Sequence, residues 1–120
     1  MAKFVLVDDS KVARNFLRSI LEDAGHEIVG EGVNGLEGFD LFQELKPDII
    51  TLDVVMPVAT GIDCLKKIIG IAPDANVLMV TSVGKDSLIE KSKGLGAKDV
   101  IVKPIDENKV LEAVSAILAG

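Results

Sequence analysis

Five side chains that could bind a cation or a phosphoryl group each follow a short apolar run. Asp8 and Asp9 follow the first run, Asp53 follows the second, and Thr81 and Lys103 follow the third and fourth. If these runs are parallel strands, the five side chains meet, because open α/β sheets bind ligands outside the carboxyl ends of their strands. Three carboxylates, a hydroxyl and an ammonium at that edge predict a site for a divalent cation and a phosphoryl group.

The residue types favour magnesium and phosphoryl transfer. Neighbouring carboxylates raise each other's pKa, and a divalent cation relieves that repulsion. Mg²⁺ prefers oxygen ligands, which Asp8, Asp9 and Asp53 could supply. Asp53 is the predicted nucleophile, since a carboxylate can attack phosphorus to give an acyl phosphate. Lys103 would add positive charge beside the phosphoryl oxygens, and the Thr81 hydroxyl could donate a hydrogen bond to one of them.

Composition limits the remaining possibilities. The chain has 120 residues, the usual size of one domain, and its single cysteine, Cys64, cannot form an internal disulfide. We therefore expect a reducing, cytoplasmic location. No apolar run approaches the roughly 20 residues that span a bilayer, so no membrane association is predicted. The net charge of −6 disfavours direct binding to nucleic acid, which relies on Lys and Arg to neutralise phosphates.

Apolar runs alternate along the chain with longer amphipathic stretches, a pattern typical of βαβ units and of a parallel sheet covered on both faces. The predicted strands are 3–7, 27–32, 48–52, 76–80 and 99–102. The predicted helices are approximately 10–24, 34–45, 61–70, 86–94 and 106–118. The fold class is therefore α/β, with a doubly wound, five-stranded parallel sheet in a single domain covering residues 1–120.

Helical spacing predicts which side chains face the core. In the first helix these are Val12, Phe16, Leu17, Ile20 and Leu21, and in the last helix Val110, Leu111, Val114, Ile117 and Leu118. The stretch 86–94 is the weakest predicted helix, because its serines and terminal glycine leave a thin apolar face. Met56 is expected to pack beneath the loop after Asp53. His26, which follows the helix-ending Gly25 and lacks a cluster of carboxylates or cysteines around it, is expected to be an exposed turn residue.

Five motifs in order resemble one known family, the receiver domains of bacterial two-component response regulators. They are Val7-Asp8-Asp9-Ser10, Leu52-Asp53-Val54-Val55-Met56-Pro57 with Gly61, Val80-Thr81-Ser82, Gly96-Ala97 and Lys103-Pro104. The resemblance covers residues 3–119 and is to stand-alone, CheY-like members, with no output domain in the 120 residues. It implies a flavodoxin-like sheet with strand order 2-1-3-4-5.

The same resemblance implies roles for the acidic residues. Asp53 would be the phosphoacceptor, Asp9 a direct Mg²⁺ ligand, and Asp8 a ligand acting mainly through water. Val55 would contribute its backbone carbonyl to the metal. Such a chain is a phosphorylation-controlled signalling protein rather than an enzyme, because it catalyses only its own phosphorylation and dephosphorylation.

The resemblance also implies a switch and two protein partners. Thr81 would be the switch hydroxyl and Lys103 the phosphate-binding ammonium. The phosphoryl group would come from a sensor histidine kinase or phosphotransfer protein. A downstream protein target would bind the face made by the fourth helix, the fifth strand and the fifth helix.

Departures from the family pattern predict differences in readout and lifetime. Val100 replaces the usual switch aromatic and Ile105 a common phenylalanine, so the signal is expected to pass mainly through the loop 81–85 and the fourth helix. Val55 and Val83 occupy the positions that flank the approach of hydrolytic water. Their apolar side chains cannot orient a water molecule, which predicts slow autodephosphorylation.

The sequence is compatible with several functions. Within the family, the chain could act in chemotaxis, as a phosphorelay intermediate or as a phosphate sink. An Mg²⁺-dependent aspartyl-phosphate hydrolase is a different class, but such enzymes place an aspartate general acid two residues after the nucleophile, where this chain has Val55. An FMN-binding flavodoxin is disfavoured because the acidic turn after the first strand would repel a phosphate.

Overall fold

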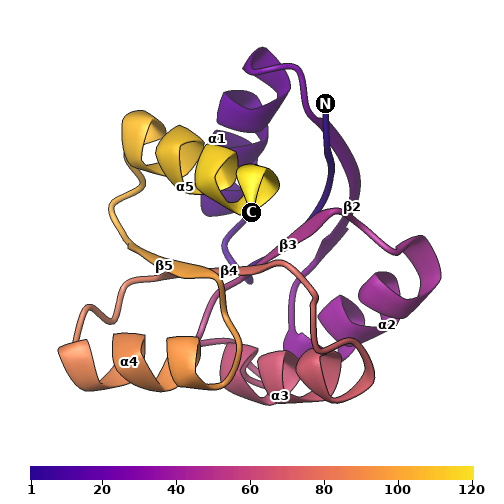
Figure 1. Ribbon diagram of the computed structural model, residues 1–120, viewed down its shortest axis with the longest axis vertical. Coiled ribbons are helices and arrows are strands. Elements are labelled where there is room, and N and C mark those ends of the chain that lie inside the picture. The colour runs from indigo at the N-terminus through magenta and orange to yellow at the C-terminus, as the bar shows by residue number, and fades with distance from the viewer.

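The computed structural model describes residues 1–120 as a parallel five-stranded sheet between two layers of helices (Figure 1). The strands are β1 (Lys3–Val7), β2 (Glu27–Gly32), β3 (Ile49–Leu52), β4 (Val77–Thr81) and β5 (Asp99–Val102). The helices are α1 (Lys11–Asp23), α2 (Gly35–Leu45), α3 (Gly61–Ile71), α4 (Asp86–Gly94) and α5 (Glu107–Ala119). The strand order β2-β1-β3-β4-β5, with every neighbouring pair parallel, confirms the predicted topology.

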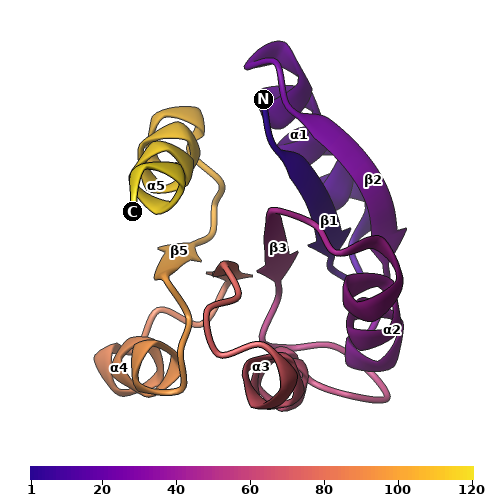
Figure 2. The ribbon, with the colours of Figure 1, turned by 45° about the vertical axis from the view of Figure 1, so that its right-hand side comes forward.

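The two faces of the sheet carry separate apolar cores. Helices α1 and α5 cover one face, while α2, α3 and α4 cover the other (Figures 1 and 2). Successive side chains of a strand point to opposite faces, so Phe4 and Leu6 join the core under α1 and α5, and Val5 and Val7 join the other core. Burial on both faces fixes the register of the central strands and hence the positions of the residues at their carboxyl ends.

Most of the helices begin at a residue whose side chain caps the first turn. Side chains at four N-caps accept a hydrogen bond from the backbone N–H three residues later, namely Ser10, Asn34, Thr60 and Asp106. Helix α4 differs, because Lys85 at its N-cap provides no such bond. Its one fully buried side chain is Ser92, whose hydroxyl has no hydrogen-bond partner. Helix α4 is therefore the least well anchored helix, as its thin apolar face predicted.

The apolar face of α1 is narrower than predicted. Leu17, Ile20 and Leu21 are buried, but Val12 is 80% exposed and Phe16 is 50% exposed. At 3.6 residues per turn, Val12 falls on the opposite side of the helix from the buried three, and Phe16 falls on the flank. The prediction that these two residues face the core was wrong.

Two further predictions need correction. Leu118, in the last turn of α5, is 43% exposed. At 3.6 residues per turn it falls on the flank of the helix rather than on the stripe of the buried Val110, Ala113 and Val114. His26 is not an exposed turn residue, since its side chain is partly buried with its ring centroid 5.2 Å from that of Phe4. Its Nδ1 accepts a hydrogen bond from the Ala2 N–H at 3.0 Å, and burial lowers the pKa of the imidazole.

Candidate functional site

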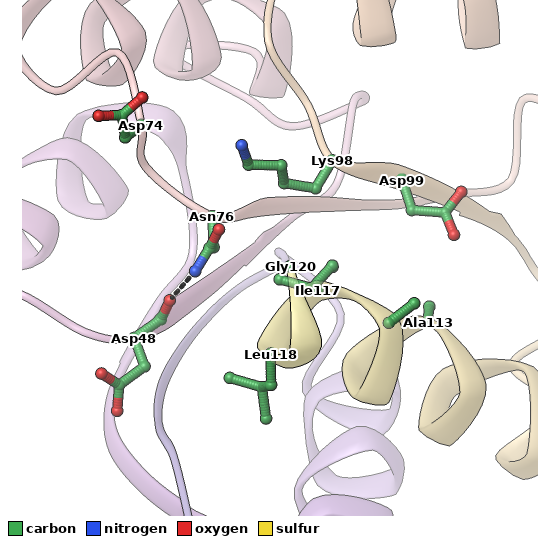
Figure 3. Close-up of a pocket in the computed structure, with 10 residues that line it drawn as sticks. Asp48, Asp74, Asn76, Lys98, Asp99, Ala113, Ile117, Leu118 and Gly120 are labelled. Atoms are coloured by element: carbon green, nitrogen blue, oxygen red, sulfur yellow. Dashed lines mark hydrogen bonds between the residues drawn. The ribbon is translucent and has the colours of Figure 1, made fainter.

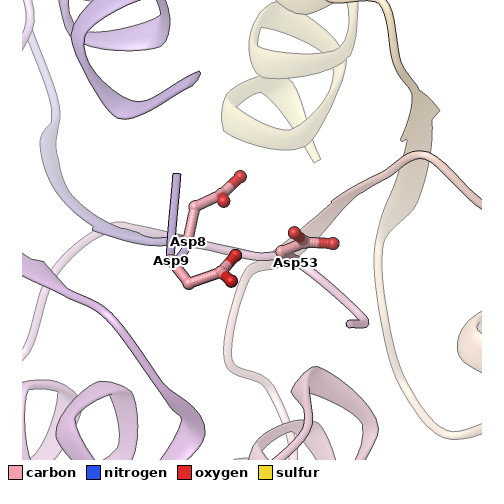
Figure 4. Close-up of side chains that lie close together, drawn as sticks. All are labelled: Asp8, Asp9 and Asp53. Atoms are coloured by element: carbon pink, nitrogen blue, oxygen red, sulfur yellow. The ribbon is translucent and has the colours of Figure 1, made fainter. Parts of the chain in front are cut away.

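Three carboxylates converge at the carboxyl ends of two adjacent central strands. Asp8 and Asp9 follow β1, Asp53 follows β3, and their side chains lie close together at the strand ends (Figure 4). One carboxylate oxygen from each lies within 4.8 Å of the others. Asp8 and Asp53 are buried, whereas Asp9 is exposed, so the cluster opens to solvent on one side. The predicted meeting of these residues is confirmed.

Lys103, at the end of β5, places its ammonium among these carboxylates. Its Nζ lies 2.8 Å from Oδ2 of Asp8 and 3.3 Å from Oδ2 of Asp53. Burial lowers the pKa of Lys103, but hydrogen bonds and the charges of both aspartates outweigh it and raise the pKa overall. Burial and the charge of Asp8 raise the pKa of Asp53, and Lys103 opposes that shift. Three carboxylates and one ammonium give the cluster an excess of negative charge, so it can bind a cation.

Each buried carboxylate also shapes its own turn. Oδ1 of Asp8 accepts the Ser10 N–H at 2.8 Å, and Oδ1 of Asp53 accepts the Val55 N–H at 3.3 Å. An aspartate that bonds the backbone two residues later stabilises a turn by itself. The side chains are thereby held on the strand ends, with their Oδ2 atoms directed to Lys103.

The loop between β3 and α3 packs tightly against the backbone of Asp53. A Cβ at Gly61 would lie 1.9 Å from the Asp53 carbonyl oxygen, so only glycine fits there. Met56 is buried beneath the loop, as predicted. Val58 has a positive φ of 68°, and the Ala59 N–H donates to the Pro57 carbonyl at 2.8 Å, which together define a three-residue turn.

The remaining predicted site residues lie at the edge of the cluster. Thr81, the last residue of β4, is fully buried, and its hydroxyl oxygen accepts the Val83 N–H at 3.2 Å. The Val55 side chain is 59% exposed, and Val83 is partly buried. The structure thus brings the three aspartates and Lys103 into one cluster, while the Thr81 hydroxyl is engaged within its own loop.

Sequence reasoning missed a group of charged residues behind the cluster. Nη1 of Arg14 donates to the Asp8 carbonyl oxygen at 2.5 Å, and its Nε donates to Glu31 at 2.9 Å. Arg18 also binds Glu31, with Nη2 at 2.6 Å. Burial raises the pKa of Glu31, but the hydrogen bonds and charges of the two arginines hold it below its ordinary value. Two arginines four residues apart on one helix face were the available signal.

The donor set fits a hard divalent cation. All three candidate ligands are carboxylates, and oxygen ligands in a partly solvated cluster suit Mg²⁺, which usually keeps several waters. Receiver domains typically bind Mg²⁺ at such an acidic cluster. The chain can therefore supply both ligand charge and an open side for a phosphoryl group.

The largest cavity lies at the opposite edge of the sheet. It measures about 670 Å³ and lies between the amino ends of β3, β4 and β5 and the last turns of α5 (Figure 3). On its wall, Asn76 donates to the backbone carbonyl of Asp48 at 3.1 Å. The acidic cluster, by contrast, lines none of the cavities.

The fold and the acidic cluster are those of a signalling domain that accepts a phosphoryl group. The family model described as response regulator receiver domain matches residues 4–115, and the chain belongs to that family. The chain is therefore a receiver domain of two-component signalling, with relatives that act as chemotaxis proteins. None of its helices has the length and apolar character needed to cross a bilayer.

Similar proteins include two curated bacterial relatives. The chain is 43% identical over 118 residues to Protein CcdB of Bacillus subtilis, covering 98% of each chain. It is 38% identical over 115 residues to the Chemotaxis protein CheY of Thermotoga maritima, covering 96% of each. A crystal structure of the CheX-CheY-BeF3-Mg+2 complex from Borrelia burgdorferi contains a similar chain, with a TM-score of 0.94 and 34% identity. That match covers 97% of this chain and 88% of the other.

Proposed function

We propose that Asp53 is the phosphoacceptor of a single receiver domain spanning residues 1–120. The observation that carries the proposal is the position of the Lys103 ammonium, 2.8 Å from Asp8 and 3.3 Å from Asp53, beside carboxylate oxygens within 4.8 Å of one another. An acceptor carboxylate next to a cation site and a partly buried ammonium is the arrangement that phosphoryl transfer needs, because the reaction depends on positioning and charge stabilisation.

The proposed donor is a phosphohistidine on a sensor kinase or phosphotransfer protein. A carboxylate oxygen of Asp53 forms the new O–P bond as the N–P bond breaks, and the imidazole nitrogen keeps the electron pair and takes a proton from solvent. Mg²⁺, held by Asp8, Asp9, Asp53 and the carbonyl of Val55, would supply positive charge to the phosphoryl oxygens. Lys103 binds one of those oxygens, and Thr81 would donate to another after its hydroxyl turns from the local loop.

The proposed output is binding to a downstream protein through α4, β5 and α5. A groove of about 390 Å³ runs between β5 and α5, lined by residues that include Val100, Val102 and Lys109. The Borrelia relative is held with BeF3 and Mg²⁺ in a complex with CheX, which supports a protein target. Chemotaxis is the proposed pathway, because several similar proteins are chemotaxis proteins. The proposed location is the cytoplasm.

The direct test is intact mass after incubation with acetyl phosphate and Mg²⁺. We expect one added phosphoryl group on the wild type and on Asp74→Asn, a matched change at an exposed aspartate on the opposite edge of the sheet. Asp53→Asn, and wild type treated with EDTA, should show none. An adduct of equal yield on Asp53→Asn would overturn the assignment of the acceptor.

The absence of any aspartate two residues after Asp53 also separates this proposal from a hydrolase. Val55 occupies that position and has no group that can protonate a leaving alcohol. Incubation with a small phosphate ester should therefore release no phosphate beyond the background of the Asp53→Asn variant.

A further inference from the structure

We propose that Arg14 is a positioning residue for the metal site, because its guanidinium ties the peptide between Asp8 and Asp9 to strand β2. The inference rests on the proposed Mg²⁺ site and adds a residue that touches neither the metal nor the phosphoryl group. Its basis is the contact of Nη1 with the Asp8 carbonyl oxygen at 2.5 Å and of Nε with Glu31 at 2.9 Å.

Both polar groups of the Asp8 backbone are anchored to the same neighbouring strand. The Asp8 N–H donates to the Gly32 carbonyl at 3.1 Å, and the Asp8 carbonyl is joined through Arg14 to Glu31. The Asp8 carbonyl and the Asp9 N–H belong to one rigid peptide plane. Fixing that carbonyl therefore fixes the orientation from which the exposed Asp9 side chain starts.

Arg14 is itself held in place. Its side chain is only 12% exposed, and its backbone N–H donates to the Ser10 carbonyl at 3.1 Å in the first turn of α1. Glu31 receives Arg18 as well, at 2.6 Å, so its carboxylate is fixed from two sides. The planar guanidinium can bind the carbonyl and the carboxylate together, which a lysine ammonium on a flexible stem cannot do with the same geometry.

The charge of Arg14 and its role in orienting Asp9 predict opposite changes in Mg²⁺ affinity when Arg14 is replaced. Loss of a positive charge near a cation site should tighten Mg²⁺ binding by simple Coulomb attraction. Loss of a group that orients a ligand should weaken it, typically by 10-fold or more for residues that support metal ligands. The sign of the change in affinity therefore separates a positioning role from a general electrostatic one.

Arg18 offers a matched control. It binds the same Glu31, also carries one positive charge and lies one turn further along α1, but it has no contact with Asp8. Arg18→Gln removes the same charge and one anchor of Glu31, while leaving the Arg14 contact with the Asp8 carbonyl available.

The test is calorimetric titration of Mg²⁺ into metal-free protein, without any phosphoryl donor. We expect Arg14→Gln to raise the Kd about 10-fold, Arg14→Lys to raise it less, and Arg18→Gln to leave it unchanged or lower. Amide NMR shifts at Asp9 in the metal-free protein should move in Arg14→Gln and stay in place in Arg18→Gln. If Arg14→Gln fails to fold, Arg14→Lys carries the same comparison.

An Arg14→Gln Kd equal to or lower than that of Arg18→Gln would overturn the positioning role and leave the proposed function intact. A wild type that binds no Mg²⁺ would overturn the metal site together with this role. Failure of acetyl phosphate to label Asp53 would overturn the proposed acceptor but leave the comparison of Mg²⁺ affinities valid. The three failures are thus distinguishable.

Discussion

Replacing Lys103 by methionine should destabilise the metal-free protein, and Mg²⁺ should restore most of the loss. Methionine keeps a long apolar stem but removes the ammonium that lies between Asp8 and Asp53. Those two carboxylates are buried and would then face each other without an opposite charge. A divalent cation in the same cluster would supply the missing positive charge.

The distances set the size of the effect. At an effective dielectric constant of about 20, the Asp8 contact at 2.8 Å corresponds to about 6 kcal/mol of attraction and the Asp53 contact at 3.3 Å to about 5 kcal/mol. Much of this attraction is offset by the desolvation of the lysine and by relaxation of the mutant site. Removal of one partner from a buried ion pair typically costs 3–5 kcal/mol, and we expect about 3 kcal/mol here because the Lys103 side chain is 20% exposed.

The assay is urea unfolding at neutral pH, with Mg²⁺ and with EDTA. Lys66→Met is the control, since Lys66 is exposed and should change the free energy of unfolding by less than about 0.5 kcal/mol. Burial and Asp8 raise the pKa of Asp53, so its contribution to stability is full below the ordinary value of 3.8 and is lost as the pH rises through the folded value. The deficit of Lys103→Met should therefore shrink on acidification. A Lys103→Met protein as stable as Lys66→Met in EDTA would refute the reasoning.

Four further outcomes follow from other features. Ser92→Ala should raise the free energy of unfolding by about 1 kcal/mol in thermal melts, because it removes a buried hydroxyl without a partner; an equal loss would show that the hydroxyl is bonded. Val58→Gly should raise the free energy of unfolding by a similar amount, because a φ of 68° strains the β-branched Val58. Glu31→Gln should lower the free energy of unfolding by about 1 kcal/mol at neutral pH, because it removes the ion pairs with Arg14 and Arg18. The pKa of Glu31 is lowered in the fold, so this loss should disappear as the pH falls below 4.5 in pH-dependent melts. The double variant Val55→Asn, Val83→Glu should lose phosphate faster, because polar side chains there can orient a hydrolytic water molecule. The decay of the mass adduct measures this rate, and an unchanged lifetime would refute the role assigned to the two valines.

The parts of the fold that local patterns determine could be predicted from the sequence. Short apolar runs separated by amphipathic stretches predicted the strands, and parallel pairing placed Asp8, Asp53 and Lys103 at one edge. The bounds of every helix and strand lie within one residue of the prediction. The helix starts were predictable because caps such as Asn34 and Asp106 set them by their own hydrogen bonds.

Features that depend on the rotation of a helix or the path of a long side chain could not be predicted. Apolar residue type alone does not show that Val12 turns away from the sheet, because that depends on which stripe of α1 meets β1. The contact between Arg14 and the Asp8 carbonyl likewise requires the relative placement of α1, β1 and β2. His26 was misjudged because its partner, the Ala2 N–H, is 24 residues away in the chain.

Contacts at the ends of β4 and β5 predict that a change at Asp53 reaches α4 before the other helices. The Lys103 N–H donates to the Thr81 carbonyl at 2.7 Å, so the two residues proposed to bind phosphoryl oxygens are joined at the ends of β4 and β5. The loop after Thr81 leads directly into α4, which lacks a side-chain cap at Lys85 and buries the unpaired hydroxyl of Ser92. Segments with few anchoring contacts open at the lowest free energy. With Val100 in place of an aromatic switch, we expect the signal to be read from this helix, so Ser92→Ala should reduce the phosphorylation-dependent change in its amide shifts while leaving the phosphorylation of Asp53 intact.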